Sequence, residues 1–396
     1  MLYCPSARRH LCTAMLSRVS WTFIVILMSF VLYAQDNVPV FISGQDGFKS
    51  FRIPAIITMP DGKLLAFAEG RVHHSGDFGD VDIVMKTSSD KGKTWSSTRT
   101  VVNYDTLQAG NCAPVLDVMD PNYPQGRIFL FYNTGNNHEY EVRKGNGLRE
   151  VWYITSTDAG ETWSKPVNIT TQVHKPLRPY IHPQYNFAED WRAYANTPGH
   201  AIQITRGKYK GRLYIAANHS YGDPQPNGKD YRAHGYYSDD HGKTFRISDN
   251  VSLEGGNESM AVELPGGRLM LNIRNQAGFI KARYVALSKD GGQSWYKEYF
   301  DDQLPDPVCQ GSILRINKKT IAFCNLNNTI KRNNLTLRIS TNKGKTWKKS
   351  IPIYSNDQIN SAAAYSDLVL LDKNTIGILY EKDNYSQIVF KAVRWK

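Results

Sequence analysis

The stretch SSDKGKTW, residues 88–95, indicates the fold because close copies of it return at irregular intervals along the chain. The further copies are STDAGETW (156–163), SDDHGKTF (238–245), SKDGGQSW (288–295) and STNKGKTW (340–347). An Asp or Asn side chain accepts hydrogen bonds from its own turn, and the following Gly allows a positive φ. The repeat therefore predicts a recurring hairpin with an aromatic anchor, and each loop has too few acidic residues for a calcium site.

Between these copies the sequence reads as short strands bounded by turn residues. Alternating apolar and polar residues, rich in β-branched and aromatic types, indicate strands; examples are KLLAFAEG (63–70), RIFLFYN (127–133), RLYIAANHS (212–220), RLMLNIRN (268–275) and TIGILYEKD (375–383). Propeller blades have four strands in roughly 40–50 residues, with insertions. We therefore predict an all-β, six-bladed β-propeller of four-stranded antiparallel blades, occupying residues 35–396 as one domain.

The first 34 residues have the features of a secretory signal. The apolar run Trp21–Tyr33 follows Arg18 and precedes Ala34-Gln35, which predicts a cleavable signal peptide over residues 1–34. A membrane anchor is the alternative, but it needs about 20 apolar residues. We expect a secreted or periplasmic protein with no stable membrane insertion.

Charge and cysteine content exclude several classes of protein. The chain holds 48 Lys and Arg against 36 Asp and Glu, a net charge of +12, yet no run of five basic residues occurs, so no nucleic-acid partner is indicated. Outside the predicted signal only Cys112, Cys309 and Cys324 remain, which allows one disulfide at most, with 309–324 the favoured pair. The histidines do not have the spacing of metal ligands, so we assign no metal and no cofactor. The histidines considered are His73, His74, His182 and His200.

Four further blocks connect the chain to a known family. They are SFRIPAI (50–56), LLAFAEGR (64–71), ELPGGRLMLNIRNQ (263–276) and NNLTLRIS (333–340). The five repeats resemble Asp boxes. Together, the repeats and these four blocks resemble the exo-sialidase (neuraminidase) family, and they follow one another in the family's order across roughly residues 38–395. The resemblance implies a glycoside hydrolase that releases terminal sialic acid from glycans, and we expect the protein to be a monomer. A non-catalytic glycan-binding propeller and a trans-sialidase remain as alternatives.

The resemblance assigns arginines to the substrate. Sialic acid carries a carboxylate beside its anomeric carbon, and the planar arginine fork binds a carboxylate in bidentate fashion. By resemblance Arg52, Arg274 and Arg332 bind this group, with Arg338 as the alternative to Arg332. Arg71 would help to hold the substrate.

The same carboxylate explains why the implied nucleophile is a tyrosine. An anionic nucleophile would be repelled by the substrate, whereas a phenol is neutral until a base takes its proton, and sialidases are known to use tyrosine. Tyr365 in SAAAYSDLVLL fits this position, with Tyr354 and Tyr385 as competitors. Its base would be Glu258, and the alternatives are Glu254 and Glu263.

The acid that protonates the leaving sugar should lie in the loop VHHSGDFGDVDIV, residues 72–84. Asp77 stands six residues beyond Arg71 and fits the family, while Asp80 and Asp82 are alternatives. Two features depart from the family: Gly110-Asn111, where many members have an acid after the glycine, and the insertion 175–203. In that insertion the two aromatic candidates could line the glycan side or simply pack; they are Trp191 and Tyr194.

Overall fold

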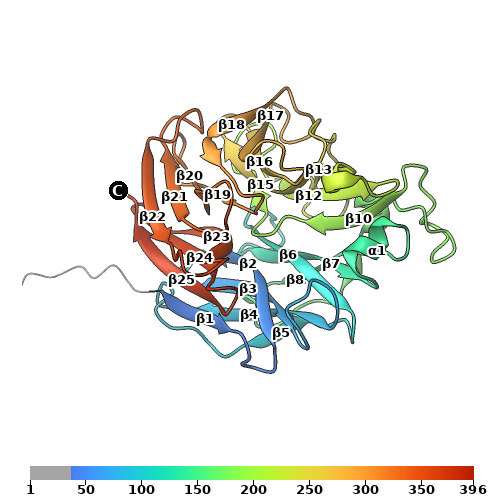
Figure 1. The fold of residues 1–396 in the computed structure, drawn as a ribbon, viewed down its shortest axis with the longest axis horizontal. Helices are drawn as coiled ribbons and strands as arrows, with labels where there is room; N and C mark the ends of the chain where they lie inside the picture. The colour runs from blue at the N-terminus through green and yellow to red at the C-terminus, as the bar shows by residue number, and fades with distance from the viewer. Residues whose placement is uncertain (1–36) are drawn as a thin grey trace, which may run out of the picture. The chain divides into compact units, whose positions relative to one another are not determined.

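The computed structural model describes residues 37–396, and the predicted signal segment 1–34 lies outside the described residues. The described residues belong to one compact unit. Its regular structure is almost wholly β-strand, and the strands hydrogen-bond into five sheets arranged around a centre (Figure 1). The prediction of an all-β propeller is confirmed.

Three sheets have four strands each. One contains, in spatial order, β1 (Val38–Ile42), β25 (Gln387–Arg394), β24 (Thr375–Lys382) and β23 (Ala363–Asp372). The next two follow sequence order: β15 (Gly256–Leu264), β16 (Arg268–Asn275), β17 (Ala282–Ser288) and β18 (Lys297–Pro305); then β19 (Ser312–Arg315), β20 (Ile321–Leu326), β21 (Leu335–Ser340) and β22 (Lys349–Tyr354). Because β1 pairs with β25, the two ends of the described region close in one sheet.

The other two sheets are larger. A five-stranded sheet contains β10 (Trp191–Asn196), β12 (Leu213–Tyr221), β13 (Tyr231–Ser238), β14 (Arg246–Ile247) and β11 (Ile202–Gln203), which pairs with β12. The eight-stranded sheet contains β2 (Ser50–Thr58), β3 (Leu64–Arg71), β4 (Val81–Ser88), β5 (Arg99–Val102), β6 (Gln108–Asp117), β7 (Arg127–Gly135), β8 (Arg149–Ser156) and β9 (Val167–Asn168). Helical turns are short: α1 (Glu139–Arg143), α2 (Thr170–Val173) and the 3-10 turn η1 (Pro226–Gly228).

The predicted count of six separate blades is wrong. The described residues form four separate blades of four or five strands, together with the eight-stranded sheet. The physical reason is a single parallel pair, in which Val81 at the start of β4 meets Gln108 at the start of β6. This pair joins two antiparallel groups, β2–β5 and β6–β9, into one hydrogen-bonded sheet.

The repeated motif closes a turn, as predicted. In the first copy the Asp90 carboxylate accepts hydrogen bonds from the Lys93 and Thr94 N–H groups at 3.0 Å. Ser88 Oγ accepts from Gly92 N–H at 2.9 Å and donates to Asp90 at 2.8 Å. This bond to the serine was not foreseen. In the last copy the amide of Asn342 takes the place of the carboxylate and accepts from Thr346 N–H at 2.9 Å.

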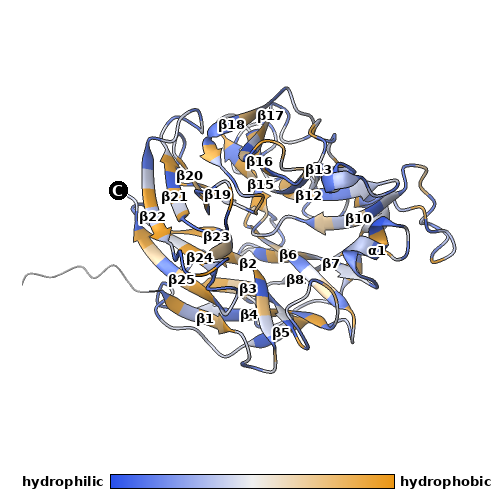
Figure 2. Ribbon diagram, viewed as in Figure 1, coloured by the Kyte–Doolittle hydropathy of each residue, from blue (hydrophilic) through white to orange (hydrophobic). Residues whose placement is uncertain are grey.

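The aromatic residue of the motif joins neighbouring parts of the core. Ring centroids lie 5.5 Å apart for Trp95 and Phe390, so the first copy packs against β25 of the closing sheet. Figure 2 shows hydrophobic residues gathered along strands such as β24 and β25, with hydrophilic residues in the connecting loops. The repeats thus anchor one sheet on the next through buried aromatic area.

Two further sequence-based expectations concern cysteines and membranes. The predicted Cys309–Cys324 disulfide is wrong, because all three described cysteines are free and buried. Cys324 lies on β20 directly opposite Ser312 of β19, so Cys309, three residues before β19, is out of register with it. Within residues 37–396 no helix has the length and apolar content needed to cross a bilayer.

Candidate active site

A large polar pocket opens where the central strands begin. Its volume is about 920 Å³. Four strands lie at the centre of the propeller, namely β2, β6, β15 and β23 (Figure 1). Each contributes residues near its N-terminal end to the lining of the pocket. In an antiparallel pair the end of one strand lies beside the start of the other, so the ends of β3 and β16 also reach this pocket.

Each of these four strands is bulged at the pocket. The pairing shifts between Arg52 and Ala55 in β2, and equivalent shifts occur in the other three strands, at Gly110/Ala113, Gly256/Ser259 and Ala363/Ser366. A bulge adds one unpaired residue and turns a side chain away from the regular alternation. Ile53 has a φ of 57°, a costly value for a β-branched residue, and this places Arg52 at the pocket.

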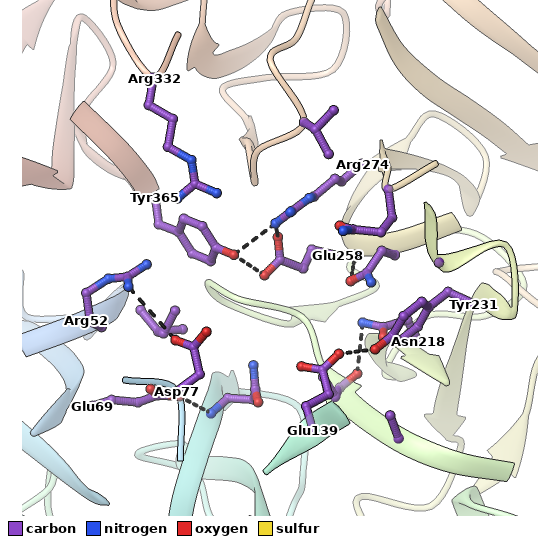
Figure 3. Close-up of a pocket in the computed structure, with 18 of the residues that line it drawn as sticks. Arg52, Glu69, Asp77, Glu139, Asn218, Tyr231, Glu258, Arg274, Arg332 and Tyr365 are labelled. Carbon is purple, nitrogen blue, oxygen red and sulfur yellow. Dashed lines mark hydrogen bonds and ion pairs between the residues drawn. The ribbon is translucent and has the colours of Figure 1, made fainter. Parts of the chain in front are cut away.

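All seven residues predicted from the sequence line this pocket: Arg52, Arg71, Asp77, Glu258, Arg274, Arg332 and Tyr365. Figure 3 shows the three arginines of the predicted clamp around one tyrosine, with Asp77 across that ring from Arg332 and 4.0 Å from Arg52. The guanidinium carbons of Arg52 and Arg332 lie 5.5 Å and 5.9 Å from the centroid of the Tyr365 ring. Segments up to 313 residues apart in the chain therefore meet at one point.

Tyr365 and Glu258 are joined by a hydrogen bond at the centre of the group. The Tyr365 hydroxyl donates to one oxygen of Glu258, and Arg274 Nη1 donates to the other oxygen at 2.6 Å and to the Tyr365 hydroxyl at 3.1 Å. Burial, followed by the charge of Glu258, raises the pKa of Tyr365 well above its usual range. The phenol is therefore neutral near pH 7 and needs a base to become a nucleophile.

Asp77 is held from one side by Arg71. Arg71 Nη1 donates to Asp77 Oδ1 at 2.8 Å, and Arg71 also binds the buried carboxylate of Glu69 at 2.7 Å. The Asp77 side chain is nevertheless 70% exposed, so it faces the open pocket. Although the surrounding protein opposes ionisation, Arg71 and then Arg52 outweigh it and lower the pKa of Asp77.

Two residues have positioning roles that were not foreseen from the sequence. Glu381 on β24 is fully buried and accepts from Arg52 Nε at 2.7 Å, Ile53 N–H at 2.9 Å and Tyr365 N–H at 3.1 Å. One carboxylate therefore fixes the arginine, the bulge and the backbone of the tyrosine together. Tyr385 is the second; its ring lies 3.9 Å from the Arg52 guanidinium carbon, and its hydroxyl accepts from Arg332 Nη1 at 2.9 Å.

The turn that carries Tyr385 is unusual in its backbone. Asp383, Asn384 and Tyr385 have φ values of 49°, 51° and 65°, three consecutive residues in the left-handed region. Such conformations cost free energy and tend to occur where function requires them. The only sequence signal for this turn was the alternating strand followed by Asp-Asn-Tyr. For Glu381 the signal was weaker still, a glutamate within the strand pattern of LYEKD.

The side of the pocket away from Arg332 is lined by residues for which no role was predicted. Helix α1 brings Glu139 to the pocket, where it accepts a hydrogen bond from the Tyr231 hydroxyl (Figure 3). Arg143 forms a bidentate pair with Asp230 at 2.6 and 2.9 Å. Arg149 at the start of β8 is buried and donates to Gln108.

The competing candidates mostly lie elsewhere. Tyr385 reaches the pocket in the role described above, whereas the others do not line it: Asp80, Asp82, Glu254, Glu263, Arg338 and Tyr354. Glu263 stands at the far end of β15, where it binds Arg315 and Thr205. Of the two aromatics in the 175–203 insertion, Trp191 is stacked on His219 with centroids 3.4 Å apart, whereas Tyr194 lines the pocket while bonded to His234.

One described trio has the spacing of metal ligands. Asp117, Asp120 and His241 bring ligand atoms within 4.8 Å of one another. Asp117 already accepts from Met119 N–H and His241, and Asp120 accepts from Arg127 at 2.9 Å. Because protein donors satisfy these carboxylates, the trio is a hydrogen-bonded cluster and gives no argument for a metal.

Comparison with known proteins identifies the family. The BNR repeat-like domain family matches residues 62–378. A sialidase of Micromonospora viridifaciens is 32% identical over 380 residues, covering 88% of this chain and 52% of the relative. An exo-alpha-sialidase of Arthroderma benhamiae is 31% identical over 367 residues, covering 86% and 79% respectively. The chain therefore belongs to the sialidase family, and the predicted resemblance is confirmed.

Solved structures give the same fold. The Hadza microbial sialidase Hz136 superposes with a TM-score of 0.75 at 26% identity, covering 91% of this chain and 68% of that one. The Trypanosoma rangeli sialidase, solved with the inhibitor DANA, has a TM-score of 0.64 at 20% identity, covering 91% and 58%. The chain spans about half the length of the Micromonospora relative and 64% of a sialidase of Bacteroides fragilis.

Proposed function

We propose that this protein is a retaining exo-α-sialidase, which hydrolyses terminal sialic acid from glycoproteins, glycolipids or oligosaccharides through a covalent tyrosyl intermediate. The observation that carries the proposal is the Tyr365–Glu258 hydrogen bond within the group of three arginines. A protein that only bound sialylated glycans would use the arginines but would not need a phenol bonded to a base. The pair therefore favours an enzyme over the glycan-binding alternative.

Substrate binding would begin at the arginines. Arg52, Arg274 and Arg332 would bind the carboxylate of the sugar, and this places the adjacent anomeric carbon next to the Tyr365 hydroxyl. Arg332 lacks a carboxylate within 4.0 Å among residues 37–396, and only Nη1 donates to a side chain there, that of Tyr385, so donors remain for the carboxylate of the substrate. Bidentate guanidinium–carboxylate pairing orients the sugar as well as holding it.

The first chemical step would form the glycosyl–tyrosine bond. Glu258 accepts the phenolic proton as the Tyr365 oxygen attacks the anomeric carbon, and the bond to the leaving sugar breaks. Asp77 gives its proton to the leaving oxygen, so that the aglycone departs as an alcohol. A neutral phenol avoids the repulsion that a carboxylate would meet from the charged substrate.

The second step would reverse these proton transfers. Asp77, now a carboxylate, accepts a proton from water as the water oxygen attacks the anomeric carbon. The bond to Tyr365 breaks, and Glu258 returns its proton to the phenolate. Two inversions at the same carbon give net retention of configuration.

The proposal is tested with a fluorogenic sialoside and by proton NMR of the first product. Wild-type protein should release the fluorophore with saturation, and the α anomer should appear before mutarotation. The β anomer as first product would exclude a covalent intermediate. Absence of release from any sialoside would exclude the sialidase activity itself.

The proposal includes secretion as a monomer. Secretion rests on the apolar run at residues 21–33, which lies outside the described residues. Recovery of the protein from culture medium or periplasm with an N-terminus near Gln35 would support it, and retention of the segment in a cytosolic protein would contradict it. Light scattering of the purified protein tests the oligomeric state.

A further inference from the structure

Two loops beside the pocket expose large apolar side chains to solvent. Phe279 and Ile280, between β16 and β17, are 59% and 39% exposed. Ile330, between β20 and β21, is 85% exposed, more than any other large hydrophobic residue within 37–396. A single exposed apolar residue is ordinary, but a group of them beside a functional pocket marks an interaction surface.

A third segment connects these two loops. The sheets β15–β18 and β19–β22 are neighbours around the propeller, and residues 306–309 lead from the first to the second (Figure 1). Lys281 O accepts from Asp306 N–H at 3.0 Å, which holds this segment against the loop between β16 and β17. Val308 and Ile330 both line the pocket. We call the four apolar residues on this side of the pocket mouth the apolar rim: Phe279, Ile280, Val308 and Ile330.

The protein itself holds the apolar rim in place. Asn328 Oδ1 accepts from Ile330 N–H at 2.8 Å, so the turn that presents Ile330 is fixed. The Phe279 ring packs edge-on against Phe300 with centroids 5.8 Å apart and is still more than half exposed. Val308 has a φ of 66°, a costly value for a β-branched residue. A partner therefore meets side chains that are already ordered.

Two lysines flank the apolar rim. Lys281 follows Ile280 and Lys331 follows Ile330, and both lysines are exposed. Among residues 37–396 neither lysine has a carboxylate within 4.0 Å, since the ion pairs of these two sheets are made by arginines. The net charge of the chain is +12. The rim and its surroundings therefore favour an anionic partner.

The form of the apolar rim selects among anionic partners. Its residues come from separate loops, and exposed polar residues such as Asn327 and Thr329 stand on the same loops. A stable protein interface needs a continuous complementary surface of about 800 Å² on each side. The headgroup layer of a bilayer adapts to separate loop tips, and apolar side chains flanked by lysine are the combination that binds an anionic membrane surface.

We propose that the apolar rim binds the protein reversibly to an anionic lipid bilayer, and that sialylated glycolipids in such a bilayer are the preferred substrate class. The choice of substrate rests on the proposed function, whereas the binding to lipid does not. Because the rim and the mouth of the pocket share one face, a bound molecule holds its pocket beside the sugars of that bilayer. Their effective concentration rises, and a soluble oligosaccharide gains no such advantage.

Binding is tested first on vesicles that carry no sugar, so that the pocket plays no part. In flotation at low salt, wild-type protein should bind vesicles of phosphatidylcholine with about 30 mol% phosphatidylserine at least about tenfold more than phosphatidylcholine alone. The double variant Phe279→Ser/Ile280→Ser should lose about tenfold or more of this binding, because two apolar side chains no longer enter the membrane. Lys281→Gln should lose about fivefold.

Matched controls lie at the opposite end of the strands. Val118 follows β6, which starts at the pocket, and Tyr296 precedes β18, which ends beside it; they are 48% and 46% exposed. Val118→Ser/Tyr296→Ser should therefore bind vesicles as wild type does. Lys93→Gln, in an exposed Asp-box turn, removes the same charge as Lys281→Gln and should also leave binding unchanged.

Catalysis is then compared on a sialylated glycolipid in anionic vesicles and on sialyl-lactose in solution. Phe279 and Ile280 do not line the pocket, so their double variant should lose about tenfold in kcat/KM on the glycolipid and keep the wild-type value on sialyl-lactose. An equal loss on both substrates, at an unchanged melting temperature, would show that the rim serves the sugar and would overturn the inference.

The vesicle results decide the lipid partner independently of turnover. Equal binding of wild type to neutral and anionic vesicles, or equal binding by the rim and control double variants, would overturn the inference and leave the sialidase activity intact. Self-association that is lost in Phe279→Ser/Ile280→Ser, without vesicle binding by wild type, would assign the rim to a protein contact instead. Cleavage of neither substrate would overturn the proposed function, while flotation with sugar-free vesicles would still decide whether the rim binds lipid.

Discussion

The Tyr365 hydroxyl and the Glu258 carboxylate form a hydrogen bond between strands β23 and β15, although 107 residues separate them in the chain. Arg274 donates to both partners, so the phenol, the base and one arginine form a closed triangle. Each of the three side chains is held by hydrogen bonds to the other two, so the group is pre-organised before the substrate binds.

Removal of the Tyr365 hydroxyl should abolish the covalent route. We expect Tyr365→Phe to lower kcat by about 10³-fold, because no other side chain can form the same intermediate. Tyr299→Phe, on β18 and outside the pocket, is the matched control and should keep full activity. Retention of normal kcat in Tyr365→Phe would remove the nucleophile assignment.

Replacement of the base Glu258 should slow the chemical step and leave substrate binding nearly unchanged. Glu258→Gln keeps the shape of the side chain but cannot take the phenolic proton, so kcat should fall by about 10²–10⁴-fold while KM changes little. Steady-state kinetics on one sialoside measures both constants. A rise in KM alone would show that Glu258 serves the substrate-binding arginine Arg274 and not Tyr365.

The role of Asp77 can be read from the pH profile. As an acid Asp77 acts only while protonated, and Arg71 lowers its pKa, so activity should decline as the pH rises through that lowered value. Arg71→Met should move this decline to higher pH, because the carboxyl loses its main stabilising charge.

Asp77→Asn should lose much less activity on an aryl sialoside than on a sialyl-lactose, because a phenol leaves without an acid. An equal loss on both substrates would contradict the acid assignment.

Tyr385 should act on binding through two arginines. Tyr385→Phe keeps the ring under Arg52 but loses the hydroxyl that accepts from Arg332 at 2.9 Å. We expect KM to rise about tenfold with kcat little changed, the size of one hydrogen bond to a charged group. Tyr385→Leu should raise KM further. A fall in kcat at constant KM would assign Tyr385 to the chemical step instead.

Acid stability should depend on a buried histidine group beside the pocket. Burial lowers the pKa of His234 to about 3, and it lowers the pKa of His174 and His219 as well. The unfolded chain binds these protons from about pH 6.5 downward, so the free energy of unfolding should fall as the pH drops below that value. For His234 alone the loss between pH 6.5 and pH 5 is about 2 kcal/mol.

His234→Gln tests this dependence. Its free energy of unfolding, measured in urea at pH 7 and at pH 5, should change less between the two pH values than that of wild type. The exposed His73→Gln is the control and should keep the wild-type dependence. Equal pH dependence in His234→Gln and wild type would show that His234 is not the group responsible.

The Asp-box turns should matter for stability and not for catalysis. Ser288→Ala removes the hydroxyl that accepts from Gly292 N–H at 2.8 Å and donates to Asp290 at 2.7 Å. We expect about 1 kcal/mol less free energy of unfolding and an unchanged kcat/KM, since Ser288 does not line the pocket. A loss of activity at unchanged stability would contradict the structural role.

Local sequence signals predicted the structural features that depend on residues close together in the chain. The Asp-x-Gly turns, the alternating strands and the aromatic anchors all follow from residues close together in the chain, and the structure shows them. Resemblance to the family then named the residues of the pocket, including Arg52 in FRIP and Tyr365 in its run of small residues. The blade count failed because it depends on one pair, Val81 with Gln108, that no periodicity reveals. The disulfide failed because spacing along the chain does not report strand register.

The sequence by itself determined an all-β propeller of the sialidase family, because hairpin turns and strand alternation are read within a few residues. Only the tertiary structure decided how Glu381 joins Arg52 to the Tyr365 backbone and how Tyr385 lies between two arginines. These relationships are contacts between distant strands, fixed by β-bulges and by the closure of β1 on β25. Their energies depend on burial and on which charge lies opposite, and those quantities exist only after the chain has folded.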